Sequence, residues 1–194
     1  MKQSVVLYLH LSVILLSVGF MANCHSTNSS NSPTSPLFDK YFQVPKDQLS
    51  PSLKHWTKLK LSDQKKEEIQ VLSKAMEHYQ RNEFASTIEY LQQILDRQDV
   101  PKVSDQNELI YYLGISFMAD QQFDQAQLQF DQLEGLRIFK YNGDLLWFKA
   151  LNHLAKEENQ SAKVLLKSMI KKKVKPYFPM AEQLLAENLF KENE

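Results

Sequence analysis

The chain contains very little cysteine and glycine, and it carries no net charge. Its 194 residues include one cysteine and four glycines, and 23 basic side chains balance 23 acidic ones. A single cysteine excludes an internal disulfide. So few glycines argue against a glycine-rich phosphate loop and against an all-β fold with many tight turns. Without an excess of positive charge, we expect no nucleic-acid partner.

Motifs for catalysis and metal binding are also absent from the sequence. It contains no H-E-x-x-H, C-x-x-C or G-x-S-x-G pattern, and His25, His55, His78 and His153 stand apart from one another. A lone histidine on a helix is far more often a packing or surface residue than a ligand. We therefore expect a protein that is not an enzyme and that binds no metal and no cofactor.

The first 23 residues combine a positively charged start with an apolar stretch. Lys2 precedes an apolar run over residues 5–20, and Cys24 follows where this run stops. The pattern resembles a bacterial lipoprotein signal peptide over residues 1–23, although Met21 and Asn23 depart from the residues that such signals prefer. An uncleaved membrane anchor and an ordinary secretory signal are the alternatives, but a span needs about 20 apolar residues. We expect an exported chain, lipid-anchored to a bacterial membrane through Cys24.

Residues 24–36 are rich in serine, asparagine, threonine and proline. They contain no large apolar side chain after the cysteine, so they are expected to form a flexible tether. Surface-exported lipoproteins of the Bacteroidetes type usually carry acidic residues just after the cysteine. This segment has none, which favours a protein that faces the periplasm.

Helical patterns fill the chain from residue 62 to residue 192, and nothing alternates like a strand. One helix is expected over residues 62–80 and the next over residues 84–98. Asp105 followed by Glu108 predicts an N-terminal cap for a third helix. The letters YNGD at residues 141–144 predict a turn. Two helices follow, and a last helix over residues 180–194 would carry an apolar side formed by Met180, Leu184, Leu185 and Leu189.

Small and large residues recur along this region at spacings of 39 and 36 residues. The small ones are Ala75, Gly114 and Ala150, then Thr87, Ala126 and Ala162, and the large ones are Leu91, Phe130 and Leu166. The middle unit resembles the tetratricopeptide repeat through Leu113, Gly114, Phe117, Phe123, Ala126 and Phe130. The other two units depart from the signature at Lys74, His78, Lys149, His153 and Asn159.

This resemblance implies an all-α fold over residues 62–192. The family forms a right-handed superhelix, here of about three antiparallel helix pairs with a C-terminal capping helix. Small residues let the two helices of a pair approach closely, so Gly114 is expected to lie against Ala126 in the middle pair.

In tetratricopeptide proteins the first helix of each pair lines a groove that binds a peptide or a helix of a partner. The corresponding positions here are apolar and uncharged, which disfavours the version that clamps a terminal carboxylate. They are Leu72, Met76 and Tyr79, then Tyr111, Ile115 and Met118, then Trp147, Leu151 and Leu154. An uncovered apolar groove of this size is a liability, so either a protein partner or the chain itself is expected to fill it.

Residues 37–61 are the candidate internal occupant. Phe38, Tyr41, Phe42 and Trp56 gather in this segment, which is similar to aromatic stretches that precede the repeats in small exported Bacteroidetes proteins. Four aromatic side chains this close together are expected to pack on the repeats. Self-filling and partner binding both remain open at this point.

A lysine-rich run at residues 167–175 has two interpretations. It could bind anionic lipid or nucleic acid, or its cations could complement the dipole at the end of a helix, and the second interpretation is favoured.

The sequence as a whole predicts a lipid-anchored, non-catalytic protein-interaction module or assembly accessory. One alternative is an accessory subunit of an outer-membrane assembly or nutrient-uptake complex. Another is a small-molecule or glycan binder that uses groove aromatics such as Tyr111 and Trp147.

Overall fold

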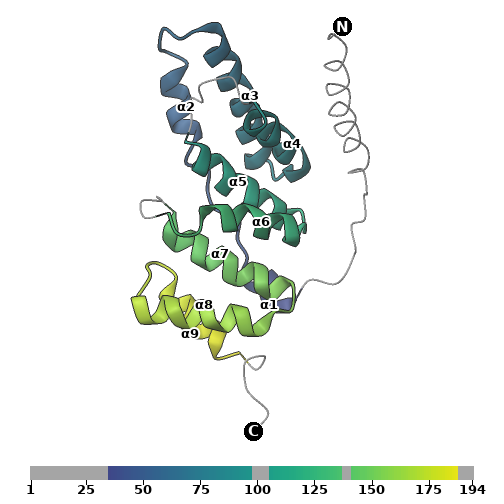
Figure 1. Cartoon of the computed structure of the whole chain (residues 1–194), viewed down its shortest axis with the longest axis vertical. Helices are drawn as coiled ribbons and strands as arrows, with labels where there is room; N and C mark the ends of the chain where they lie inside the picture. The colour runs from purple at the N-terminus through teal and green to yellow at the C-terminus, as the bar shows by residue number, and fades with distance from the viewer. Residues whose placement is uncertain (1–34, 98–104, 137–140, 188–194) are drawn as a thin grey trace, which may run out of the picture. The chain divides into compact units, whose positions relative to one another are not determined.

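All regular secondary structure in the described part of the chain is helical. The computed structural model describes residues 35–97, 105–136 and 141–187, and within these ranges it contains helices and no strand, which confirms the all-α class. Figure 1 labels the helices: α1 (Pro36–Tyr41), α2 (Ser50–Trp56), α3 (Asp63–Gln80), α4 (Phe84–Leu95), α5 (Gln106–Ala119), α6 (Phe123–Leu133), α7 (Asn142–Ala155), α8 (Asn159–Lys172) and α9 (Phe178–Leu185).

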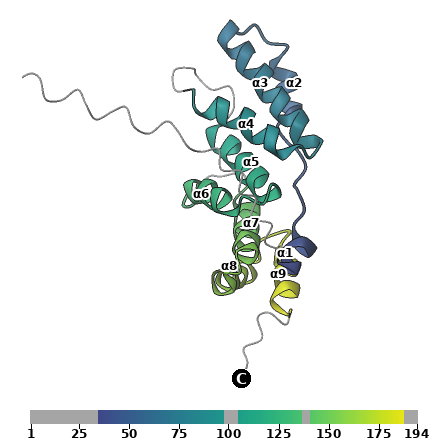
Figure 2. The same cartoon turned by 90° about the vertical axis from the view of Figure 1, so that its right-hand side faces the viewer.

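The longer helices pack as consecutive pairs. Helix α3 contacts α4, α5 contacts α6, and α7 contacts α8, while α4–α5 and α6–α7 contacts join each pair to the next. Helix α9 packs on α8. Two short helices from the N-terminal side complete the arrangement, because α1 contacts α7 and α2 contacts α3 (Figure 2).

The three hairpins have the same turn. Asn82, Gln121 and Glu157 follow the first helix of each pair, with left-handed φ angles of 59°, 60° and 60°. The next backbone N–H donates to the carbonyl five residues earlier, as in a Schellman motif. These bonds are Glu83 N to His78 O (2.9 Å), Gln122 N to Phe117 O (2.8 Å) and Glu158 N to His153 O (2.8 Å). The turns are 39 and 36 residues apart, so the spacing seen in the sequence is also a structural one.

The residue nearest to Gly114 is Phe130, one helical turn beyond the predicted counterpart Ala126. A Cβ on Gly114 would lie 2.5 Å from Cε1 and 2.9 Å from Cδ1 of Phe130. The glycine therefore makes room for a phenylalanine ring of the facing helix.

Two predicted helix starts were partly right. The Asp105 side chain accepts a hydrogen bond from Asn107 N (3.0 Å) and caps α5, as predicted. The carboxylate of Glu108 accepts a hydrogen bond from the Tyr141 hydroxyl (2.5 Å), which lies at the start of another pair. The predicted turn at 141–144 is already helical from Asn142 onward. Gly143 lies in the first turn of α7, where a Cβ would be 3.1 Å from Cγ1 of Val174.

Helix α9 begins two residues earlier than predicted, at Phe178, and its buried residues are Ala181 and Leu184. Met180 and Leu185 pack at the margin of the core. Ala181 was missed because a single small residue contributes little to an apolar pattern. Leu189 lies outside the described residues.

None of the helices in the described ranges is long and apolar enough to cross a membrane. The predicted signal peptide, Cys24 and almost all of the predicted tether lie outside the described residues, as does residue 188 onward.

Candidate functional site

The nine predicted groove residues are all buried. None exposes more than 2% of its surface, and this holds for Leu72, Met76, Tyr79, Tyr111, Ile115, Met118, Trp147, Leu151 and Leu154. They occupy corresponding positions on α3, α5 and α7. In this structure they belong to the core rather than to an open groove.

Residues 36–56, which we call the strap, run along the first helices of the pairs. The strap begins with α1 on α7, continues without regular structure over residues 42–48, and ends with α2 on α3. We call the side of α3, α5 and α7 that meets the strap the first-helix face. The strap therefore crosses all three pairs in the direction opposite to their order in the sequence.

Helix α1 contacts the last two pairs through aromatic rings. The ring of Phe38 packs edge-on against Phe123 at 5.2 Å between centroids, and Tyr41 packs edge-on against Trp147 at 6.3 Å. Phe42, just after the helix, meets Phe148 in the same way at 6.1 Å. Phe38 is 4% exposed, so this end of the strap is part of the core.

An ion pair ties the same end of the strap to the residues after α9. Lys40 Nζ lies 2.6 Å from Oε1 of Glu187, and the Tyr41 hydroxyl donates to the same oxygen at 3.1 Å. These hydrogen bonds, from Lys40 first, hold the pKa of the Glu187 carboxyl below its usual value. The pair is exposed to solvent, so it fixes position more than it adds stability.

The extended middle of the strap is held by main-chain hydrogen bonds. The Tyr79 hydroxyl donates to the carbonyl of Pro45 (2.9 Å), and the backbone N–H of Gln48 donates to the Tyr112 hydroxyl (2.9 Å). Asp47 then accepts from Leu49 N (2.7 Å) and from Gln80 Nε2 (2.6 Å), which fixes the entry into α2. Two phenols of the first-helix face thus recognise backbone groups of an extended segment.

A cluster of buried phenols supports this contact. Tyr111 stacks on Tyr141 with centroids 4.5 Å apart, and Tyr79 meets Tyr112 edge-on at 5.2 Å. Burial raises the pKa of Tyr112 to about 12, and it raises the pKa of Tyr79, Tyr111 and Tyr141 still further. These phenols keep their protons at physiological pH, so Tyr79 and Tyr112 act there as neutral hydrogen-bonding groups.

Asp144 lies at the far end of this cluster. Burial raises the pKa of its carboxyl, although hydrogen bonds from Tyr177 and Tyr111 partly oppose the shift. Tyr177 also stacks on Trp147, with centroids 5.3 Å apart. The aromatic cluster therefore continues from the strap to the segment between α8 and α9.

A hollow of about 380 Å³ lies beside the strap. It opens between strap residues 44–47 and the end of α3, and its walls include Lys46, Asp47, Tyr79, Gln80 and Asn82. These walls are largely polar, and they hold no arrangement typical of catalysis.

The histidines of the described part have structural partners or face solvent. Nδ1 of His78 lies 2.5 Å from Oε2 of Glu83, and Nδ1 of His153 lies 2.6 Å from Oε2 of Glu158. Both pairs span a hairpin turn at the same place in the repeat. His55 is exposed. No group of three or more possible metal ligands occurs among the described residues.

Several residues of this site were not predicted from the sequence. Tyr112 and Phe148 lie one position beyond the predicted groove residues Tyr111 and Trp147, and they also meet the strap, at Gln48 and Phe42. Their spacing of 36 residues is that of the repeat, and this signal could have identified them. The predicted lipid-attachment residue, Cys24, lies outside the described residues.

Comparisons with protein-family models, with curated proteins and with solved structures found no match. The functional argument therefore starts from the geometry of the strap and of the face that holds it.

Proposed function

We propose that this chain is a non-catalytic interaction module of tetratricopeptide type, anchored to a bacterial membrane through lipid on Cys24 and facing the periplasm. In this proposal the three helix pairs form a right-handed superhelix, and α9 caps its last pair. The repeated turns at Asn82, Gln121 and Glu157 support the repeat assignment, because unrelated hairpins would have no reason to share one turn geometry at the repeat spacing.

The observation that carries the proposal is the strap on the first-helix face. An extended segment lies there with its backbone bonded to Tyr79 and Tyr112 and its aromatic side chains packed on Trp147 and Phe148. Repeat proteins use their extended inner surfaces to hold such segments of partner proteins. The strap is then an internal occupant of a peptide-binding face.

With that face occupied, a protein partner would meet the rim of the strap or the outer helices. Lys46 is exposed at the rim, and Leu128 on α6 is an exposed apolar residue, at 57%. A photo-crosslinking amino acid at each position in living cells would separate these two surfaces. We expect one of the two positions to crosslink a defined protein. Absence of a protein adduct at both would contradict the role in protein binding.

The membrane anchor has its own test. Changing Cys24 to serine should remove the lipid and release the chain from the membrane fraction, while wild type stays bound. Fractionation of cells followed by immunodetection measures this. If the serine variant stays in the membrane, the apolar N-terminal run itself is the anchor and the lipoprotein assignment is wrong.

A role as accessory subunit of an outer-membrane assembly or nutrient-uptake complex is a narrower form of the same proposal. Co-purification of a much larger membrane protein with the chain supports it. Binding of a glycan or small molecule would need an accessible aromatic surface. Tyr111 and Trp147 are 1% and 2% exposed, so that alternative requires the strap to leave its face.

A further inference from the structure

The hairpin topology places the ends of the described helices at two edges. Each first helix begins at one edge and each second helix ends there, whereas the hairpin turns lie at the opposite edge. We call the former the inter-pair edge. Its first connection, before α3, and its last, after α8, both lie toward the left in Figure 1.

Basic and apolar side chains meet in the first connection. Leu59 is 46% exposed and Trp56 is half-buried, and the exposed lysines Lys54, Lys58 and Lys60 alternate with them. Among the described residues none of these lysines forms an ion pair. Backbone hydrogen bonds from Lys58 N to His55 O (3.1 Å) and from Leu59 N to Trp56 O (3.0 Å) hold this tip in a turn. Leucine and tryptophan between lysines are typical of segments that lie in a membrane interface.

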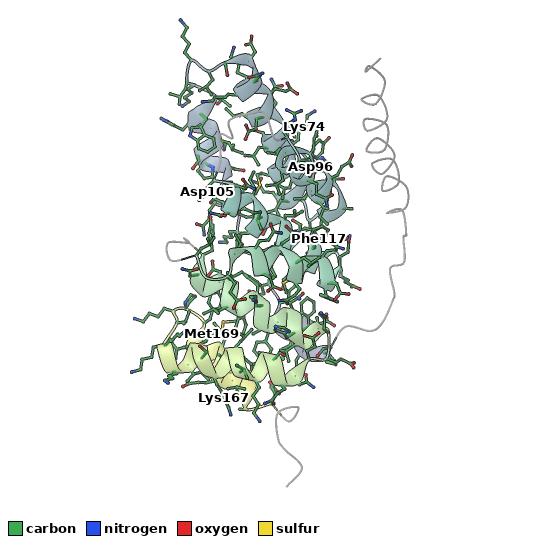
Figure 3. The ribbon with its side chains drawn as sticks, in the orientation of Figure 1. Lys74, Asp96, Asp105, Phe117, Lys167 and Met169 are labelled. Atoms are coloured by element: carbon green, nitrogen blue, oxygen red, sulfur yellow. The ribbon has the colours of Figure 1, made fainter. Side chains whose placement is uncertain are left out.

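A second lysine cluster lies in the last connection. Lys171, Lys172, Lys173 and Lys175 are exposed, and within the described ranges no carboxylate pairs with them. The helix dipole accounts for Lys171 and Lys172, which lie in the last turn of α8. It does not account for Lys175, which lies beyond the helix, or for Lys167, which points away from α7 in Figure 3 while Met169 faces α7.

Among the described residues, the opposite edge carries more acidic than basic side chains. Glu83, Asp120 and Glu157 lie at the three hairpin turns, with Arg81 beside Glu83. Lys156 lies there too, but it is bound to Asp124 (2.9 Å) and Glu158 (3.0 Å). Exposed carboxylates also lie at the inter-pair edge, at Asp96, Asp105 and Glu134, so its positive charge is concentrated in the two lysine clusters at its ends. An anionic surface would attract these two clusters.

The start of the strap lies on the last pairs, on the side of the hairpin turns, where Phe38 meets Phe123 at the beginning of α6. Helix α1 packs on α7, and Lys40 binds Glu187 just after α9, so the strap begins on the last pair. Between Cys24 and Ser35 the chain can span at most about 40 Å. A lipid at Cys24 would therefore keep the repeats within this reach of a membrane without fixing which edge faces it.

We propose that the inter-pair edge docks on anionic phospholipid headgroups, with Trp56 and Leu59 in the membrane interface and the two lysine clusters on lipid phosphates. This rests on the membrane anchorage in the proposed function. The exposed apolar tip favours a lipid surface over an acidic protein or a nucleic acid, since neither of those requires leucine and tryptophan between the lysines. Docking would hold the repeats against the membrane and leave the hairpin edge facing away from it.

The test uses the full chain, purified from membranes and reconstituted into vesicles that carry brominated lipid. Brominated acyl chains quench tryptophan only at close range, and Trp147, the other tryptophan, is buried at 2% exposure. We expect quenching of Trp56 in vesicles with about a third phosphatidylglycerol, and little in phosphatidylcholine alone. High salt should reverse it.

Lysine variants make the test specific. Each lysine near an anionic surface contributes about fivefold, so K58Q/K60Q should shift the equilibrium toward the undocked edge roughly 25-fold. The matched control K46Q/K74Q removes the same charge from exposed lysines outside the two clusters and should quench like wild type. The W56F variant, which leaves only Trp147, should show no lipid-dependent quenching.

Each other result overturns the proposal. If the chain sediments with the vesicles but Trp56 is not quenched, the anchor stands and the docking edge is wrong. Equal quenching in both lipids, or an equal effect of K46Q/K74Q, shows that charge on this edge does not direct docking. A chain that sediments with neither vesicle contradicts both the anchor and the edge. Protection of Lys58 and Lys60 from amine reagents only in native membranes, without lipid quenching, indicates an acidic protein instead.

Discussion

At the scale of single residues, each pair has one contact where a small residue of the first helix faces a large residue of the second. Residues 16 apart face each other across the middle pair, where Gly114 meets Phe130. The corresponding residues are Ala75 with Leu91 and Ala150 with Leu166, all of them fully buried. The pair with the largest facing side chain has the smallest residue opposite it. This explains why a helix interior tolerates a glycine that costs about 1 kcal/mol relative to alanine.

Replacing Gly114 and Phe130 by alanine and leucine, the residues found at this contact in the other two pairs, tests this explanation. Gly114→Ala should destabilise the fold by about 1–2 kcal/mol, because overpacking against Phe130 exceeds the gain in helix propensity. Phe130→Leu alone should cost about 1–2 kcal/mol through lost packing. The double variant should be more stable than the sum predicts by about 1 kcal/mol or more, as measured by denaturant unfolding. Strict additivity would show that the two side chains do not limit each other.

Buried polar residues mark the limit of prediction at this scale. Lys149 was recognised in the sequence as a departure from the repeat pattern, and it is 6% exposed. Its Nζ lies 2.8 Å from Oδ1 of Asp131 and 2.6 Å from Oε2 of Glu134. Those carboxylates belong to the preceding pair, on and just after α6. No local sequence pattern predicts these carboxylate partners of Lys149, because the contact forms only when two helix pairs stack.

At the scale of elements, apolar periodicity predicted the long helices well but not the route of the strap. The predicted helix over residues 62–80 matches α3, and the polar breaks fall at the hairpin turns. Those turns use Asn82, Gln121 and Glu157 with positive φ, where glycine is the usual signal. The extended path of residues 42–48 has no periodic pattern, since its conformation is set by the face beneath it.

Removing an anchor of the strap should loosen it from the first-helix face. Phe38→Ala deletes the ring that stacks on Phe42 at 4.8 Å and meets Phe123, and such truncations cost about 3–5 kcal/mol in a core. We expect a lower melting temperature and binding of a hydrophobic dye, because the aromatic face becomes accessible. Gln43→Ala, at an exposed strap position, is the control. A Phe38→Ala chain that melts like wild type and binds no dye would contradict strap packing.

At the scale of the whole molecule, the buried phenols make stability depend on alkaline pH. Free tyrosine has a pKa of about 10, whereas burial raises the pKa of Tyr112 to about 12 and shifts Tyr79, Tyr111, Tyr141 and Tyr177 upward as well. Above pH of about 10 the unfolded chain releases protons that the folded chain keeps. The free energy of unfolding therefore does not depend on these phenols below this pH, and it decreases as the pH rises toward 12 and beyond.

We expect cooperative alkaline unfolding in which phenolate absorbance and loss of helix circular dichroism rise together. Tyr111→Phe keeps the ring that stacks on Tyr141 but removes one raised pKa. The free energy of unfolding of this variant, expressed as a fraction of its value at neutral pH, should decrease less steeply with pH than that of wild type, so its alkaline transition should lie at higher pH. Phenolate formation by all tyrosines near pH of about 10, with the helix signal unchanged, would show that the phenols are not buried.

The sequence by itself determined the all-α class, the positions of most helices and the repeat spacing of 39 and 36 residues, because helical periodicity and recurring small residues are local properties of the chain. Only the tertiary structure decided what lies on the first-helix face. Phe38, Tyr41 and Pro45 find their partners more than 30 residues away, through packing and hydrogen bonds that depend on all three pairs being stacked.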